Sequence, residues 1–519
     1  DALEPVARVP ALLALRRDLA AIADDSEAVA AKRRQLDRIV QACLGLYVET
    51  VVPQADVVAG EELKLKHVAI ARATGGPAVR WVGTRYPGPG AEQAVGVALQ
   101  PNVPATVETT RALPTDTPLS QPYWLRGGGS IGLARVDDPS LIGRPENPPV
   151  FAVEHIFEIE GQQLVVADEP VQVGNDRVRG EIRRRLEVIA PVALAFGEDV
   201  ALFAPGATRV VEVAVEAARA GTAGELRLEL PAGWSAAPER QAFNLGVAGE
   251  RGRVSFSVTA PKAGATGEIV AIAEVGGRSF QNRRFEIRYD HIPPLLLQPV
   301  AQLKAVSLDV AIRGRTVAYV PGAGDAVAEG LARLGYAVTT LGDAELTPER
   351  LREFDAVVFG IRAFSSRPAL AAHLPALLAF AEAGGNVIVQ YNTPERTLTT
   401  FAPLTLRIAR NERVTEENAA MTFLAPDHPA LNVPNKLGPA DFTGWVQERG
   451  LYFPTEWDAR YTPLLGCADP GEAQKSGALL VAQHGRGHVV YTGLAFFRQL
   501  PAGVPGAYRL LANLVSLGK

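Results

Sequence analysis

The sequence predicts a multidomain chain with an N-terminal helical hairpin, two antiparallel β-sandwich-like domains and a C-terminal α/β domain. Residues 3–44 contain no glycine and place leucine and valine at helical spacing. Residues 51–289 instead contain short runs in which apolar and polar side chains alternate, separated by proline and glycine. From residue 315 onward, strand-like and helix-like segments alternate, which is typical of a parallel sheet covered by helices.

The helical segment occupies residues 1–50. Leu12 and Leu19 share one helical face, Leu36 and Val40 share another, and "ADDSE" separates the two helices. Two helices cannot bury their apolar faces against each other alone. We therefore expect the hairpin to pack on a neighbouring domain, which could lie outside this chain.

Residues 51–190 predict the first β domain. The run "FAVEHIFEIEG" alternates apolar and polar residues with a period of two, which indicates a half-buried antiparallel strand. Residues 113–149 are rich in proline and glycine and include "SQPYWLRGGG". Long ordered loops of this kind are often functional, so this loop is a candidate functional segment.

Residues 191–290 predict a second β domain. The runs "RVVEVAVEAA", "ELRLELPAGW", "RVSFSVTAP" and "GEIVAIAEVGG" follow one another at the spacing of a β-sandwich. The proline-rich "HIPPLLLQP" comes next and begins residues 291–314, which we interpret as a linker. The α/β domain then covers residues 315–519.

The α/β domain begins with a strand, a glycine-rich turn and a helix. Gly322 and Gly324 supply two of the three glycines of a dinucleotide-binding fingerprint, but Val327 occupies the third position. Asp325 would place a carboxylate at the helix N-terminus, where a phosphate should bind. The pattern therefore favours a capped strand-to-helix turn over a nucleotide site.

Composition and motifs argue against several other classes of function. Net charge is −5 with no long run of one sign, so no nucleic-acid partner is expected. No stretch of about 18 apolar residues is present, so no membrane span is expected. The two cysteines, Cys43 and Cys467, give neither a disulfide nor a metal pattern, and no Gly-x-Ser-x-Gly elbow occurs. Because the sequence starts at Asp1 and its one methionine is Met421, we expect a processed product or a fragment.

One segment, "FTGWVQERGLYFPTEWDARY", concentrates aromatic and charged residues. Aromatic faces beside carboxylates and an arginine could hold a sugar by stacking and hydrogen bonding. In the alternative interpretation the aromatics pack on the sheet edge and the charges pair with one another. The candidate ligand-binding residues of this segment are Trp445, Glu448, Arg449, Tyr452, Glu456 and Asp458.

Two further candidates follow predicted strands directly. In an open parallel sheet, ligands bind beyond the carboxyl ends of the strands. Arg362 follows "DAVVFGI" and Asn392 follows "NVIVQY", so both should lie near that crevice. A structural ion pair is the alternative role for Arg362.

Several long segments resemble the C-terminal half of bacterial multidomain PIG-L (LmbE-like) family deacetylases. They include "GIRAFSSRPAL", "AEAGGNVIVQYNTP" and "GRGHVVYTGLAFFRQLPAGVPGAYRLLANL". The resemblance implies that the α/β domain is flavodoxin-like, of the class I glutamine-amidotransferase-like type. The segment "LRLELPAGWSAAP" is similar to the Ig-like module that accompanies alpha-galactosidases.

The family's catalytic signature, His-Pro-Asp-Asp, is absent from this sequence, as is any amidotransferase nucleophile. The resemblance therefore implies an accessory, non-catalytic region of a sugar N-deacetylase, with no catalytic or metal-binding residue and no cofactor in this chain. Zinc is expected only in a missing N-terminal catalytic domain. The implied partners are a glycan or amino-sugar substrate, that deacetylase domain and, by dimerisation, a second copy of the chain.

The implied location is secreted or periplasmic. Two alternatives stay open. In one, the α/β domain is itself a hydrolase or lyase that acts on a carbohydrate with Glu448, Glu456 or Asp458 and Arg362. In the other, the chain is a structural scaffold only.

Overall fold

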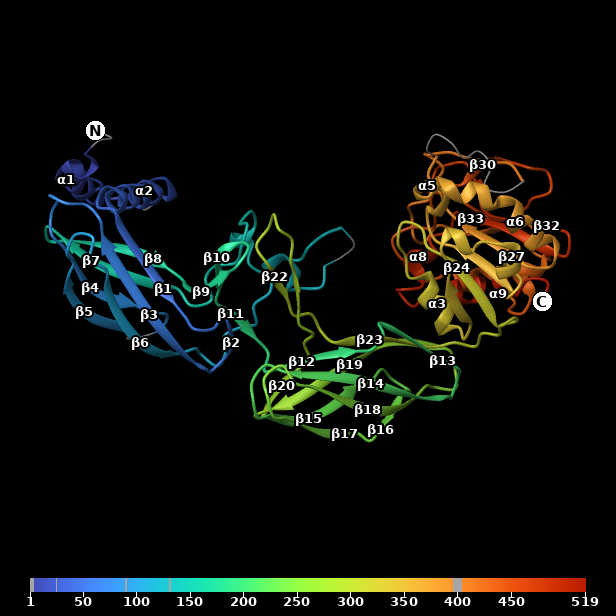
Figure 1. Cartoon of the computed structure of the whole chain (residues 1–519), viewed down its shortest axis with the longest axis horizontal. Helices are drawn as coiled ribbons and strands as arrows, with labels where there is room; N and C mark the ends of the chain where they lie inside the picture. The colour runs from blue at the N-terminus through green and yellow to red at the C-terminus, as the bar shows by residue number, and fades with distance from the viewer. Residues whose placement is uncertain (1–3, 25, 89–90, 130–131, 395–403) are drawn as a thin grey trace.

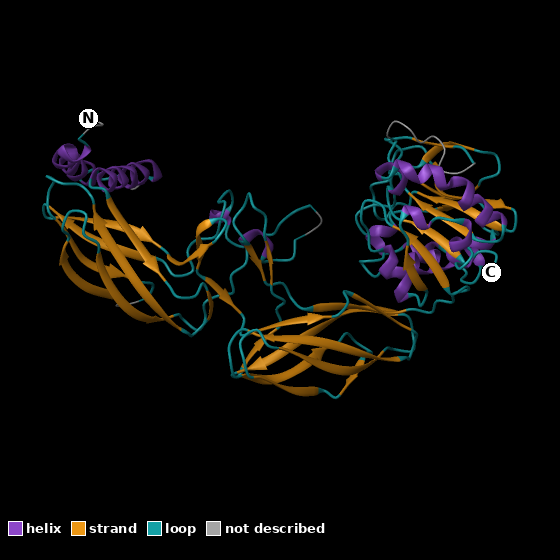
Figure 2. Cartoon of the chain, in the orientation of Figure 1, coloured by secondary structure: helices purple, strands orange, loops and turns teal. Residues whose placement is uncertain are grey.

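The computed structural model describes residues 4–24, 26–88, 91–129, 132–394 and 404–519. The chain is a multidomain, mostly β-sheet protein with few helices (Figures 1 and 2). A helical hairpin, two β-sandwiches and a layered C-terminal domain follow one another in chain order (Figure 1). Within the described ranges, no helix has the length and apolar character that crossing a membrane requires.

The N-terminal hairpin consists of α1 (Val9–Ala20) and α2 (Glu27–Cys43). The Ser26 hydroxyl caps α2 by accepting a hydrogen bond from the Val29 amide. Leu13 and Val40 are buried with Trp81 of the first sandwich in one apolar cluster. The neighbour that covers the hairpin therefore lies in this chain. The two helices agree with the prediction.

The first sandwich packs a five-stranded sheet on a four-stranded sheet. The five-stranded sheet is, in spatial order, β10 (Gly180–Arg185), β9 (Pro170–Asp176), β1 (Leu46–Val51), β3 (Glu62–Ala71) and β6 (Ala105–Ala112). The four-stranded sheet is β5 (Glu92–Ala98), β4 (Val79–Arg85), β7 (Val153–Ile159) and β8 (Gln162–Asp168). Two short strands, β2 (Asp56–Val58) and β11 (Glu187–Ile189), pair in parallel beyond them. The run "FAVEHIFEIEG" contains β7, as predicted.

Buried polar side chains bridge the two sheets of this sandwich. Both imidazole nitrogens of His67 are hydrogen-bonded, Nδ1 to the Thr50 hydroxyl at 2.9 Å and Nε2 to the Tyr86 hydroxyl at 2.9 Å. His155 Nε2 lies 3.2 Å from the Asp168 carboxylate. Burial, with the neighbouring His155, lowers the pKa of His67 to about 4. Because each group has a partner, this network reads as part of the core.

The second sandwich also has two sheets. One is β12 (Val192–Phe196), β14 (Thr208–Ala217), β18 (Arg251–Thr259) and β16 (Ser235–Ala237). The other is β13 (Val200–Phe203), β23 (Gln302–Ser307), β19 (Ala265–Val275), β15 (Thr222–Glu229) and β17 (Arg240–Leu245), with β20 (Arg278–Phe280) paired to β19. Trp234 packs edge-on against Phe203 in the core, with ring centroids 4.9 Å apart.

The range 291–314 is not a simple linker. Its first residues belong to a hairpin arm, β21 (Phe285–Ile287) and β22 (Leu295–Leu297), which extends beside the first sandwich (Figure 1). Its middle is β23, which pairs with β13 and β19 and buries Leu303 and Ala305. The Pro-Pro pair marks the turn of the arm and not a domain boundary. The second sandwich therefore continues to Ser307.

The C-terminal domain is built on an eight-stranded sheet whose first five strands are parallel. The sheet order is β25 (Ala337–Thr340), β24 (Thr316–Val320), β26 (Ala356–Phe359), β27 (Asn386–Gln390), β33 (Gly487–Thr492), β32 (Lys475–His484), β31 (Thr462–Cys467) and β29 (Thr422–Phe423). A separate pair is β28 (Leu406–Ile408) and β30 (Pro454–Trp457).

Helices cover both faces of this sheet. The α-helices are α3 (Val327–Arg333), α4 (Pro348–Leu351), α5 (Ala363–Ser366), α6 (Leu374–Glu382), α7 (Pro429–Asn432), α8 (Phe496–Gln499) and α9 (Pro505–Ser516). Short 3-10 helices are η1 (Pro5–Arg8), η2 (Tyr123–Leu125), η3 (Pro139–Leu141), η4 (Asp343–Glu345), η5 (Pro368–His373) and η6 (Pro439–Phe442). α3 and α9 contribute to one apolar core and α6 to the other.

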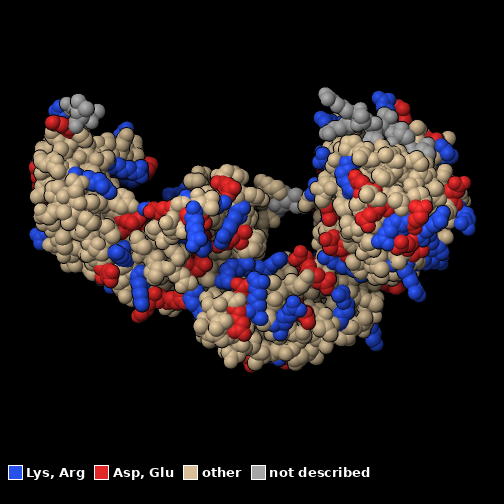
Figure 3. Space-filling view, in the orientation of Figure 1, with Lys and Arg blue, Asp and Glu red and all other residues tan. Residues whose placement is uncertain are grey.

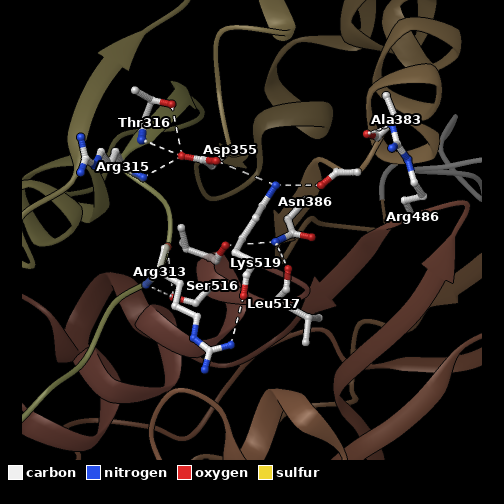
Figure 4. A network of polar contacts seen from close by, with 12 residues as sticks. Arg313, Arg315, Thr316, Asp355, Ala383, Asn386, Arg486, Ser516, Leu517 and Lys519 are labelled. Carbon is white, nitrogen blue, oxygen red and sulfur yellow. Dashed lines mark hydrogen bonds and ion pairs between the residues drawn. The ribbon is translucent and has the colours of Figure 1, made fainter.

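Hydrogen bonds close the amino end of the parallel strands (Figure 4). Asn386 donates from its amide to the carbonyls of Val515 (3.0 Å) and Leu517 (2.8 Å), and so ties α9 to β27. Asp355 accepts from the backbone amides of Arg315 and Thr316, at 2.6 and 3.1 Å. Nearby, Lys519 Nζ donates to the Gly384 carbonyl at 2.7 Å. These contacts hold α9 and the residues after it against the amino end of the sheet.

Candidate functional site

The glycine-rich turn after β24 packs against the turn after β26. A Cβ on Gly322 would lie 2.0 Å from the Ile361 carbonyl oxygen, so only glycine allows the two turns to approach this closely. Asp325 Oδ2 accepts from the Ile361 amide at 2.8 Å, and Oδ1 accepts from the Tyr319 hydroxyl (2.6 Å) and the Val327 amide (2.9 Å). The carboxylate thus occupies the donors that a phosphate would need. These contacts agree with the predicted strand-to-helix turn.

Three aromatic rings gather at the carboxyl ends of β27 and β33, next to this pair of turns. Tyr391 directly follows β27, and its ring centroid lies 5.9 Å from that of Tyr452 and 5.4 Å from that of Phe497. Ile361 and Leu451 are buried in the same apolar cluster. We call Tyr391, Tyr452 and Phe497 the aromatic cluster. Tyr391 is nearly buried, whereas Tyr452 and Phe497 are half-buried and therefore remain partly accessible to solvent.

Arg362 lies beside the aromatic cluster without a partner. Its guanidinium makes no hydrogen bond or ion pair with any residue that the structure describes, and its Nε is buried. Burial raises the pKa of Tyr391, and Glu448 adds to that rise. The Arg362 guanidinium is close enough to lower the same pKa in part. An arginine in this state has donors free for a ligand.

Backbone strain is concentrated around the same place. Five described residues other than glycine have positive φ, and three of them are Arg362 (56°), Gln447 (67°) and Tyr452 (51°). Left-handed backbone at such residues costs free energy and gathers at functional sites more often than elsewhere. Here it sets the position of Arg362 and Tyr452 at the crevice.

Glu448 is a buried residue that supports this site by holding two arginines. Its carboxylate is buried and accepts from Arg498 Nε at 2.6 Å and from Arg413 at 3.1 Å. Arg498 in turn lies over the Phe497 ring, 4.8 Å from its centroid, and donates to Gln447. Both carboxylate oxygens are thus occupied by arginine donors, so Glu448 does not offer a free acid or base.

The structure brings Arg362, Glu448 and Tyr452 together and gives the other predicted residues different roles. Trp445 is buried and donates from its indole to the Asp441 carbonyl at 3.0 Å. Arg449 is buried and donates to the carbonyls of Ala419 and Phe442, at 2.9 and 2.6 Å. Both are core residues, because they are buried and their side chains donate to backbone carbonyls.

Asn392 lies close to the crevice but serves the fold. Its side-chain oxygen accepts from the Ser365 amide at 3.1 Å, and its amide donates to the Gln390 carbonyl at 3.0 Å. It is fully buried, so it cannot contact a ligand. It fixes the start of α5, the helix that follows Arg362.

Glu456 and Asp458 each pair with an arginine of their own. Glu456 is an exposed residue of β30 and pairs with the exposed Arg407 at 3.0 Å. Asp458 pairs with Arg460 at 2.8 Å, and this hydrogen-bonded pair lowers the pKa of its carboxyl to about 2. The alternative interpretation, in which the charges pair with one another, therefore describes these two residues.

The sequence contained a signal for residues that the prediction missed. Tyr391 directly follows β27, and Phe497 and Arg498 lie a few residues after β33. The rule that selected Arg362, that ligand groups follow parallel strands at their carboxyl ends, selects these residues as well. The groups that the structure brings together are the three rings of the aromatic cluster, two of which bear a phenol hydroxyl, and the guanidinium of Arg362. The carboxylate of Glu448 is next to them and is paired with Arg413 and Arg498. They can bind a polar ring compound, and they include no paired nucleophile and base.

Comparisons with known proteins leave the family open. No family model matches the chain, and no curated protein matches it. Solved structures that align with parts of it include the seventh ScaB type I cohesin from Pseudobacteroides cellulosolvens, at 15% identity over 23% of this chain and 94% of that one (TM-score 0.13). Salmonella alpha-2-macroglobulin reacted with methylamine aligns at 13% identity over 52% of this chain and 16% of that one (TM-score 0.19). The sporulation control protein Spo0M from Bacillus subtilis aligns at 13% identity over 41% of this chain and 90% of that one (TM-score 0.14). Scores this low carry no inference about fold or function.

Proposed function

We propose that this chain is the accessory, non-catalytic region of a PIG-L family zinc-dependent sugar N-deacetylase, and that its C-terminal domain holds a glycan. The observation that carries the proposal is Arg362, which lies beside the aromatic cluster and has no hydrogen-bond or ion-pair partner among the described residues. In this proposal the zinc and the catalytic residues belong to an N-terminal deacetylase domain, and the protein acts in the periplasm or outside the cell.

The sheet order supports a flavodoxin-like, glutamine-amidotransferase-like domain. Numbered in chain order, the five parallel strands are arranged 2-1-3-4-5, which is the order of doubly wound flavodoxin-like sheets. In such sheets the ligand crevice lies where the strand order reverses, between the carboxyl ends of strands 1 and 3. These strands are β24 and β26, and Arg362 follows β26.

The chemistry of the crevice suits a sugar. The accessible parts of the Tyr452 and Phe497 rings can pack against the apolar face of a pyranose ring, and phenol hydroxyls can bond to its hydroxyls. Arg362 can donate to a ring hydroxyl, an N-acetyl carbonyl or a carboxylate. Neither tyrosine hydroxyl of the cluster is hydrogen-bonded to the described residues, so both remain open to a ligand.

An accessory role fits better than a second enzyme in this domain. Glu448 is neutralised by two arginines, and Glu456 and Asp458 pair elsewhere on the surface. None of these carboxylates faces the crevice as a free acid or base. A hydrolase or lyase that uses them therefore has no observation in its favour.

The test measures binding of N-acetylglucosamine pentamer, and of its deacetylated counterpart, by isothermal titration calorimetry. Arg362→Ala should weaken binding about tenfold or more, because a buried charged hydrogen bond is lost. Arg407→Ala is the matched control, since Arg407 pairs with Glu456 on the exposed surface of the same domain. Mass spectrometry of the sugar should show it intact. Binding that is equally strong in both variants would refute the site, and absence of binding to both sugars would favour the scaffold alternative.

A further inference from the structure

A second pocket lies at the junction of the two sandwiches, far from the crevice in the chain. Its volume is about 130 Å³, and its walls come from three segments. These are the long loop after β6 (Ser120 to Val150), the end of β10 with β11, and the turn of the hairpin arm at Pro293 and Pro294. The elements that contribute to it, β10, β11 and β22, lie close together in Figure 1. The predicted functional loop thus forms part of a binding-sized space.

Hydrogen bonds fix the walls before any ligand arrives. Gln298, just after β22, donates from its amide to the carbonyls of Ser120 (2.8 Å) and Val188 (2.9 Å). Its side-chain oxygen accepts from the Ala190 amide at 3.1 Å. In the loop, Asn147 donates to the Gln121 carbonyl at 2.8 Å. A pocket whose walls are already ordered spends little free energy on ordering when it binds.

The lining is mainly rigid and apolar. Five prolines contribute to it, together with the half-buried Trp124 and the two leucines of the arm, Leu295 and Leu296. An apolar cavity of about 150 Å³ is large enough for benzene, so this pocket can take the ring or short chain of a small molecule. A tryptophan face also attracts organic cations.

Charge decides between an anionic and a cationic ligand. Three arginines line the pocket together with two carboxylates, Glu146 and Glu187, and seven carboxylates in all pair with these arginines. Positive and negative side chains are intermixed over the face of the molecule that Figure 3 shows. An anion would therefore find these guanidinium groups occupied, whereas a cation placed at Glu187 would also meet the carboxylates of Asp56 and Glu286. The pairs are Arg183 with Glu49 and Glu181, Arg184 with Asp56, Glu187 and Glu286, and Arg185 with Glu146 and Glu169.

Glu187 is the carboxylate left without a strong partner. Its carboxylate makes no hydrogen bond with the described residues, and its nearest cation is Arg184 at 3.9 Å. The carboxylate oxygens of Asp56, Glu187 and Glu286 lie within 4.8 Å of one another. Burial, with Asp56 and Glu286 against Arg184 and Arg185, raises the pKa of Glu187 to about 7.

We propose that this pocket binds a small organic cation, with its ammonium group on Glu187 and its apolar part between Trp124 and the prolines. The inference is independent of the glycan site, because it uses other residues and another part of the chain. An ammonium group pairs with the ionised form of the Glu187 carboxylate. Binding should therefore weaken as Glu187 becomes protonated.

Three probes of one shape test the proposal: benzylammonium, benzyl alcohol and benzoate, each titrated by calorimetry into the whole chain at pH 8. Benzylammonium should bind about tenfold or more tightly than the other two, because it alone pairs with a partly buried carboxylate. Its affinity should fall about tenfold between pH 8 and pH 5.5, since the acid form of Glu187 dominates below pH 7. Equal binding of the alcohol and the ammonium would overturn the proposal, as would absence of benzylammonium binding.

Two variants locate the site. Glu187→Gln keeps the shape of the side chain, should weaken benzylammonium binding about tenfold, and should abolish its pH dependence. Trp124→Leu should weaken the binding of benzylammonium and of benzyl alcohol to the same extent. Val247→Ser, at an exposed position of the second sandwich, is the control and should change neither. The midpoint of thermal unfolding of Glu187→Gln above pH 7 should be no lower than that of the parent chain. An unchanged benzylammonium affinity in this folded variant would refute the site.

Discussion

The two ends of the C-terminal parallel sheet contain similar polar residues but use them differently. At the amino end, Asn386 and Asp355 direct their side-chain groups at backbone atoms of neighbouring segments (Figure 4). At the carboxyl end, Arg362 and the hydroxyls of Tyr391 and Tyr452 have no such partners among the described residues. At the amino end, polar side chains therefore hold neighbouring segments together. At the carboxyl end, the Arg362 guanidinium and the two phenol hydroxyls have no hydrogen-bond partner among the described residues.

The comparison also separates two kinds of strained or crowded backbone. The close approach at Gly322 belongs to the fold, because two turns touch there. Left-handed φ occurs at Arg362 and Tyr452, the two residues whose side chains lie at the candidate site. Substitutions at the two kinds of position should therefore differ in what they disturb.

The largest expected effect is on stability, at the shared turn. Gly322→Ala should lower the free energy of unfolding of the C-terminal domain by about 3 kcal/mol, because its Cβ would overlap the Ile361 carbonyl and force the two turns apart. Urea unfolding followed by tryptophan fluorescence measures this change. Gly438→Ala is the matched control, since nothing lies within 4 Å of a Cβ there. Equal stability of the two variants would mean that the turns can separate freely.

Sequence patterns predicted the layers of this molecule well, because periodicity reports burial directly. The hairpin, the alternating strand β7 and the parallel strands β24, β26 and β27 follow from it. The end of the second sandwich was misplaced, since "HIPPLLLQP" looks like a linker whether its prolines turn a hairpin arm or separate two domains. Pairing of β23 with β13 and β19 is a tertiary fact that no local pattern contains.

Site residues were harder to predict than strands. Arg362 could be found because the end of a parallel strand has a fixed place in the sheet. Glu456 and Asp458 were grouped with it by closeness in the sequence, which does not say on which side of a loop a side chain lies. The pocket at Glu187 and Trp124 was missed in the same way, because its walls are far apart in the chain and meet only after folding.

A second prediction contrasts the two ends directly. Asn386→Ala should cost about 2 kcal/mol of unfolding free energy, because the buried carbonyls of Val515 and Leu517 lose their donor. Arg362→Ala should change it by no more than about 0.5 kcal/mol, since no hydrogen bond or ion pair with the described residues is lost. Chemical unfolding of both variants at pH 7.5 measures the pair. A large loss in Arg362→Ala would show that this arginine is part of the fold, and would remove the main support for the glycan site.

The smallest expected effect is a pH dependence at the amino end. His488 Nδ1 lies 3.2 Å from the Asn386 side-chain oxygen, and burial, with His428 and Lys519, lowers its pKa to about 4. Between pH 6.5 and 4 the unfolded chain therefore binds a proton that the folded chain does not, so this residue lowers the stability as the pH falls. Because the imidazole is partly exposed, screening reduces the expected loss to about 1 kcal/mol. His488→Gln should remove that part of the acid sensitivity in unfolding curves at pH 7 and pH 4.5, whereas His291→Gln, on the exposed arm, should retain all of it. If the two variants lost stability equally on acidification, the imidazole at the amino end would have to be as open to water as one on the surface.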